Sequence, residues 1–82
     1  MAEIRTIREL VNLWPTRAEL ARDISAVSPL IEATTHQVHK WAENGSIPSK
    51  YQSAVLRAAT ERGFPVTAEL LITLHSPRED AA

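Results

Sequence analysis

Residues 16–45 read TRAELARDISAVSPLIEATTHQVHKWAENG and contain two helical patterns separated by a turn. The first pattern opens at Thr16, and Glu19 follows three residues later. This is the sequence of a capping box, in which two side chains satisfy free backbone N–H groups at a helix start. We therefore expect a short helix that ends where Ser28 and Pro29 interrupt the pattern. Its inward stripe would be Leu20, Ala21 and Ile24, and its solvent side Arg17, Arg22 and Asp23.

The second pattern predicts a helix whose inner face carries Val38, Trp41 and Ala42. Thr34 is the expected N-cap, with Gln37 three residues later. The helix should stop at Gly45, because glycine readily adopts the left-handed conformation of a C-cap.

An alternative register starts this second helix at Ser28 and Pro29 and turns Ile31, Thr34, Val38 and Trp41 inward. That register would place Leu30, Glu32 and Ala33 near the helix start. Those side chains are a poor set for reading bases, so the start at Thr34 is preferred.

Three further helices are expected around this pair. The first spans about residues 2–13, carries Ile4, Ile7, Leu10 and Val11, and ends before Pro15. The fourth opens at Ile47-Pro48-Ser49 and carries Tyr51, Val55, Leu56 and Ala59 up to Gly63. The last is capped by Thr67 and carries Leu70, Leu71 and Leu74. The sequence thus predicts an all-α, compact five-helix domain over residues 1–76, with a frayed tail at 77–82.

Composition excludes several classes of protein. The chain has 82 residues with 44% hydrophobic side chains, which allows one modest core. With no cysteine it can have neither a disulfide framework nor a cysteine-based zinc site. No apolar run is long enough to span a membrane, and the N-terminus is too charged for a secretory signal. We expect a soluble protein of the cytoplasm of a bacterial cell or phage host.

Charge is unevenly distributed, although the formal net charge is only -1. Between residues 34 and 60, three Lys and Arg residues face one Glu, so the net charge there is +2 before histidines are counted. From residue 61 onward, four carboxylates against two arginines give -2. The middle of the chain is therefore the part that suits a phosphate backbone.

The sequence resembles the lambda-repressor-like (Cro/CI type) helix-turn-helix regulators of phages and bacteria. The resemblance covers about residues 16–62 and rests on Leu20-Ala21, on Val38-x-x-Trp41 and on Gly45-x-Ile47-Pro48. It implies that the second helix of the pair enters the major groove of DNA, while the N-terminus of the first holds a phosphate. Family members join the two helices with three or four residues, whereas nine residues separate Ile24 from Thr34 here.

Nine residues are the expected DNA contacts under this resemblance. Lys40 and His36 can donate to guanine, and the methyl group of Thr35 can contact thymine. Gln37 can either cap the helix or contact DNA. The full set is Arg17, Thr34, Thr35, His36, Gln37, His39, Lys40, Ser49 and Lys50.

The spacing of His36 and His39 is also compatible with a pair of metal ligands. No cysteine and no third nearby ligand other than Glu32 or Glu43 accompanies them, so we expect no metal. In an arbitrary helical protein these histidines would simply form a solvated face. We expect no cofactor, and no catalytic constellation of paired carboxylates, activated nucleophile or phosphate loop, so the chain is not expected to be an enzyme.

The C-terminal helix is apolar on more than one side, because adjacent residues on a helix diverge by about 100°. Leu70, Leu71 and Leu74 are the expected contacts of a homodimer, whose DNA target would be a pseudo-palindromic operator. The sequence therefore predicts a sequence-specific duplex-DNA-binding transcriptional regulator, a repressor of phage or mobile-element type. The alternative is a protein–protein adaptor or antitoxin-like subunit that uses the apolar C-terminal helix.

Overall fold

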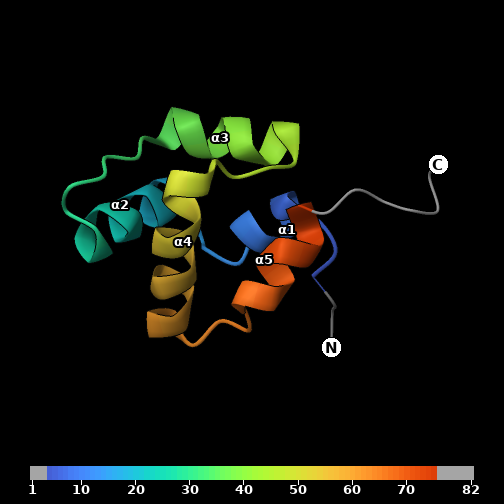
Figure 1. Ribbon diagram of the computed structural model, residues 1–82. Helices are drawn as coiled ribbons and strands as arrows, with labels where there is room; N and C mark the ends of the chain where they lie inside the picture. The colour runs from blue at the N-terminus through green and yellow to red at the C-terminus, as the bar shows by residue number, and fades with distance from the viewer. Residues whose placement is uncertain (1–3, 76–82) are drawn as a thin grey trace.

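The computed structural model describes residues 4–75, which form five helices and no strand (Figure 1). The helices are α1 (Ile7–Val11), α2 (Arg17–Val27), α3 (Thr35–Asn44), α4 (Ser49–Arg62) and α5 (Ala68–His75). The predicted all-α class is confirmed. The predicted tail at 77–82 lies outside the described residues. Within residues 4–75, none of the helices combines the length and the apolar character needed to cross a membrane.

Threonine side chains begin four of the five helices. Each hydroxyl oxygen accepts a hydrogen bond from the backbone N–H three residues later, which satisfies one of the free donors at a helix start. The pairs are Thr6 with Glu9 (3.1 Å), Thr16 with Glu19 (3.2 Å), Thr34 with Gln37 (3.1 Å) and Thr67 with Leu70 (3.0 Å). The predicted caps at Thr16, Thr34 and Thr67 are confirmed.

The prediction of a first helix over residues 2–13 is wrong in its bounds. The helix begins at Ile7 because Thr6 and Glu9 form a capping box, in which the Glu9 carboxylate accepts from the Thr6 N–H at 3.2 Å. It ends at Val11, and Asn12 is the C-cap. The predicted inward residues Ile7, Leu10 and Val11 are nevertheless all buried.

The expected capping box of α2 is only half formed. Thr16 caps the helix, but the Glu19 carboxylate accepts a hydrogen bond from Arg62 of α4 at 3.1 Å. Asp23, expected in solvent, is likewise half-buried and paired with Arg62. Both acidic side chains of α2 therefore point to α4.

The start of α3 at Thr34 is confirmed, and the alternative start at Ser28 is wrong. Residues 28–34 form a turn, in which the Ile31 N–H donates to the Ser28 carbonyl at 2.9 Å. The hydroxyl of Tyr51 in α4 donates a hydrogen bond to the backbone carbonyl of Glu32 at 2.9 Å. The long turn is therefore ordered and is tied to α4.

Gly45 ends α3 with φ of +73°, the left-handed conformation predicted for this C-cap. Its N–H and that of Ser46 both donate to the Trp41 carbonyl, at 2.9 and 3.2 Å. The chain therefore reverses directly after α3 and leads into α4.

The core lies where α3 packs across α1 and α2 while α4 packs against α2 (Figure 1). Trp41 of α3 is 4% exposed and its ring centroid lies 5.0 Å from that of Tyr51. Trp14, in the α1–α2 connection, is 3% exposed and meets Phe64 edge-on at 5.0 Å. Complete burial of an aliphatic side chain such as Leu20 contributes roughly 1.5–3 kcal/mol, so this shared core determines how the helices are placed.

The apolar side chains of α5 point in different directions. Leu71 is 4% exposed and belongs to the core, whereas Leu70 and Leu74 are half-buried against it. Ile72 is 67% exposed. Of the three residues predicted as dimer contacts, Leu71 is therefore corrected to a core residue, because its side chain is packed inside its own chain.

Candidate nucleic-acid interface

The outer face of α3 is polar and exposed. Thr35, His36, His39 and Lys40 are all exposed there, as is Glu43 near the end of the helix. The inner face is fixed by Val38, Trp41 and Ala42, all buried. The helix is thus anchored by one side and presents the other to solvent, as Figure 1 shows for its position at the edge of the molecule.

His36 and Lys40 lie one turn apart on this face. Neither side chain forms a hydrogen bond or an ion pair with any residue in the described range 4–75. Protonated lysine offers three donors, and imidazole offers a donor and an acceptor. Both side chains are therefore available to an external hydrogen-bonding partner.

His39 is joined to α2. Arg17 Nη1 and His39 Nδ1 are 2.7 Å apart, and Arg17 Nη2 donates to Asn12 Oδ1 at 3.4 Å. Asn12 is the C-cap of α1 and Arg17 is the first residue of α2, so three helices meet at one guanidinium group. This contact brings together two of the nine predicted residues.

An open pocket of about 420 Å³ lies beside this contact. It is lined by the α1–α2 connection, the first turn of α2 and the α3 side chains Thr35 and His39. The N-terminus of α2 therefore opens next to the exposed face of α3. Backbone N–H groups at a helix start favour an anion, and the positive charge of Arg17 adds to that preference.

Gln37 is committed to the fold. Its Oε1 accepts from the Thr34 N–H at 2.9 Å, which completes the capping box of α3, and its Nε2 donates to the Tyr51 hydroxyl at 3.3 Å. Of the two roles the sequence left open for Gln37, capping is the one observed. Thr34 is exposed, and its hydroxyl is the other half of this cap.

Ser49 and Lys50 begin α4 and are both exposed. Lys50 Nζ lies 5.2 Å from the centroid of the Tyr51 ring, within the range of a cation–π contact. Pro48 is the N-cap of this helix and provides no side-chain cap. The first N–H groups of α4 are therefore not satisfied by a capping side chain.

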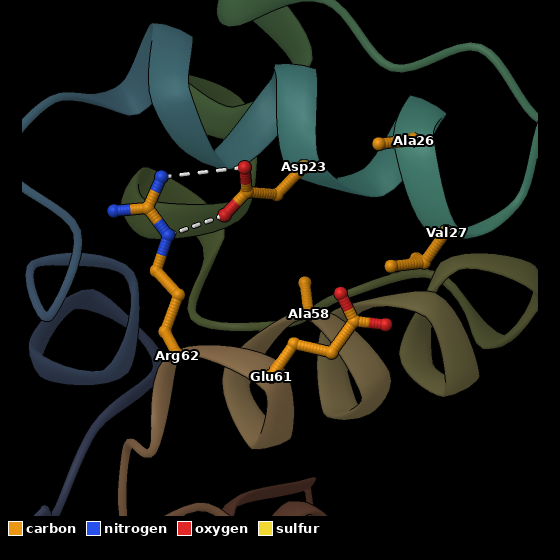
Figure 2. A pocket seen from close by; sticks show the side chains of 6 residues that line it. All are labelled: Asp23, Ala26, Val27, Ala58, Glu61 and Arg62. Atoms are coloured by element: carbon orange, nitrogen blue, oxygen red, sulfur yellow. Dashed lines mark hydrogen bonds and ion pairs between the residues drawn. The ribbon is translucent and has the colours of Figure 1, made fainter.

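Sequence reasoning missed a network at the other end of α4. Arg62 donates to both carboxylate oxygens of Asp23, at 2.6 and 3.3 Å (Figure 2). It also donates to Glu19 at 3.1 Å. Trp14 Nε1 donates to Asp23 at 2.8 Å. Asp23 and Arg62 are 39 positions apart, and no local pattern links them.

The network lowers the pKa of Asp23. Partial burial acts to raise that pKa, but the hydrogen bonds from Arg62 and Trp14 and the charges of Arg62 and Arg22 together outweigh it. Asp23 and Glu19 in turn raise the pKa of Arg62, chiefly through the hydrogen bond to Asp23. Asp23 is thus held in its charged form.

A pocket of about 180 Å³ adjoins this network (Figure 2). Asp23, Glu61 and Arg62 line it together with three small or aliphatic side chains. Figure 1 shows α4 running away from α3, so the C-terminal end of α4, which carries Glu61 and Arg62, is remote from α3. Asp23 of α2 is bonded to Arg62 at that end. The acidic groups of α2 and α4 are therefore separated from His36 and Lys40.

Residues 4–75 contain no cluster of three or more His, Asp or Glu side chains arranged to hold a metal ion. No family model, no curated protein and no solved structure matches this chain.

Proposed function

We propose that this protein is a sequence-specific duplex-DNA-binding transcriptional regulator that inserts α3 into the major groove. The observation that carries the proposal is the exposed face of α3, on which His36, His39 and Lys40 stand without a carboxylate partner among residues 4–75. An α-helix fits the major groove, and side chains near its N-terminus reach the base edges. The resemblance to Cro/CI-type regulators favours a repressor of phage or mobile-element type.

The phosphate backbone is the second part of this proposal. The N-terminus of α2, with Arg17, lies beside the exposed face of α3. Ser49 and Lys50 open α4, the next helix after α3 in the sequence, and these groups would contact phosphates. Phosphate contacts position a protein on duplex DNA, and base contacts give it specificity. A homodimer on a pseudo-palindromic operator, with half-sites about 34 Å apart, completes the proposal.

The test is selection of bound duplexes from a random pool at about 0.15 M salt, with the parent, Lys40→Ala and Arg22→Ala. Arg22 is an exposed cation whose charge acts on Asp23, so it lies near the remote network and provides a control with the same loss of charge. Lys40→Ala should lower affinity by about tenfold, because a lost base contact costs about 1–3 kcal/mol. Arg22→Ala should select the parental motif with affinity within about twofold.

Salt dependence separates this function from the alternative. Binding through several phosphates weakens steeply as salt rises, and loss of one phosphate contact reduces that slope by about one. The proposal would be overturned if no duplex were enriched and if the protein instead bound a protein partner with an affinity that does not change with salt.

The alternative function, an adaptor or antitoxin-like subunit, is favoured by the surface of α5. Ile72 is exposed beside an apolar pocket of about 250 Å³ between α4 and α5, which Leu56, Ala68 and Leu71 help to line. Ile72→Ser should abolish association with a protein partner under this alternative. Under the proposed function it should leave the selected half-site unchanged.

A further inference from the structure

We infer that Arg17 positions His39 for base recognition, by fixing its ring so that Nε2–H is the donor offered to DNA. This inference rests on the proposed function and deepens it, because it assigns specificity to His39 and a positioning role to Arg17. It begins from the 2.7 Å contact between Arg17 Nη1 and His39 Nδ1.

The chemistry of the two groups determines the direction of that hydrogen bond. A guanidinium group has five N–H donors and no acceptor, and it keeps its proton in proteins. His39 Nδ1 must therefore accept, so it carries no hydrogen in this contact. The proton of the neutral ring is then on Nε2, since the partner of one ring nitrogen sets the state of the other.

One further hydrogen bond and the burial of Arg17 hold this arrangement. Asn12 Oδ1 accepts from the other terminal nitrogen of Arg17 at 3.4 Å, so the guanidinium group is held from α1 as well as from α3. Arg17 is half-buried, whereas His39 is exposed. The ordered partner is thus Arg17, and the exposed ring takes its orientation from it.

Nε2 of His39 makes no hydrogen bond to any residue between 4 and 75. A ring that offers only a donor complements the O6 and N7 acceptors of guanine and the O4 of thymine. It is mismatched with the amino group of cytosine, which is itself a donor. His39 should therefore favour guanine or thymine over cytosine at one position of each half-site.

Two roles for Arg17, a phosphate contact and the positioning of His39, predict different effects of substitution on base discrimination. If Arg17 acted only on the backbone, its loss would weaken all sequences alike, and the effect would add to that of losing His39. If Arg17 acts through His39, both single variants lose discrimination at the same base pair, and the double variant loses no more there.

The experiment is a double-mutant cycle of Arg17→Met, His39→Ala and the double variant, with affinities measured on duplexes that differ at each half-site position. Arg17→Met removes the donors and keeps a long unbranched side chain. The expected result is a loss of about tenfold discrimination at one base pair in both single variants, with no further loss in the double variant. Arg17→Lys keeps the charge but not the planar fork, so it should retain more overall affinity than Arg17→Met without restoring full discrimination.

Nitrogen NMR of the neutral His39 ring in the free protein provides a readout that needs no DNA. The parent should show a protonated Nε2 and a hydrogen-bonded Nδ1, and Arg17→Met should lose the Nδ1 signature. Additive effects of the two substitutions, or a protonated Nδ1 in the parent, would overturn this inference while leaving DNA binding intact. Failure of the parent to bind any duplex would overturn the proposed function and the inference together.

Discussion

Arg62 of α4 forms a bidentate ion pair with Asp23 of α2, in which Nε lies 2.6 Å from Oδ2 and Nη2 lies 3.3 Å from Oδ1. The same carboxylate accepts from the indole of Trp14 at 2.8 Å. One half-buried acidic side chain therefore joins α2, α4 and the α1–α2 connection. Because α3 packs on α1 and α2, this junction supports the base on which α3 is placed.

Acid should weaken the fold through Asp23. Its pKa in the folded protein lies below the ordinary value of 3.8, so its stabilising effect is complete above that value and is lost as pH falls through the folded pKa. Asp23→Asn should lower the free energy of unfolding at pH 7 by on the order of 1 kcal/mol, since the pair is partly exposed to solvent. Its unfolding free energy should fall less than that of the parent between about pH 5 and pH 2.

Urea unfolding at several pH values measures both effects. Arg62→Met removes the partner and should likewise flatten the acid dependence. Identical acid profiles for the parent and Asp23→Asn would rule out this role for the carboxylate.

Trp41→Ala should destabilise the protein by about 3–5 kcal/mol, because it leaves a large cavity in the core. Trp41 lies on the inner face of α3 and is buried, with its ring against that of Tyr51. Thermal unfolding followed by circular dichroism tests this. Lys40→Ala, at the neighbouring exposed position, is the matched control and should melt with the parent. Equal melting temperatures for Trp41→Ala and the parent would disprove the core assignment.

His75 holds α5 against the α3–α4 turn. Its Nε2 accepts from the Ile47 N–H at 2.8 Å and its Nδ1 donates to the Leu71 carbonyl at 2.7 Å. His75→Ala leaves the N–H of a residue that is only 2% exposed without its acceptor, so it should cost about 1–3 kcal/mol. Hydrogen exchange at Ile47 should speed up in this variant. Thr73→Ala, at an exposed position of α5, should leave that exchange rate unchanged.

Tyr51→Phe should loosen the turn at residues 28–34 while keeping the core packed. The hydroxyl donates to the Glu32 carbonyl and accepts from Gln37, and its loss should cost about 1 kcal/mol. The Ile31 amide should exchange faster, and the buried amide of Val55 should not, once exchange is corrected for overall stability. Unchanged exchange at Ile31 would show that the turn is held by other contacts.

The caps and the buried stripes could be predicted because they depend on neighbours in the sequence. Thr34 and Gln37 are three residues apart, and Gly45 needs only its own backbone freedom to end α3. The capping box at Thr6 and Glu9 carries the same local signal, and recognising it would have given the correct start of α1.

The long-range pairs could not be predicted in this way. Glu19 offers the same local signal as Gln37, yet its carboxylate goes to Arg62, 43 positions away, because α4 brings a cation within reach. Likewise, the resemblance to Cro/CI-type regulators marked both Arg17 and His39 as candidate contacts for DNA, but only the packing of α3 on α2 shows that they contact each other.

The hydrogen bond from Tyr51 to Glu32 determines where the chain can tolerate insertions and deletions. The turn is bonded to α4 at Glu32, just before α3 begins. The orientation of α3 therefore does not depend on the number of residues at the tip of the α2–α3 turn, where Leu30 is fully exposed. Insertions or deletions there would be absorbed by the tip, since surface loops tolerate added length at small entropic cost. The segment from Ser28 to Leu30 is thus a place where residues can be added or removed while α3 keeps its orientation on α1 and α2.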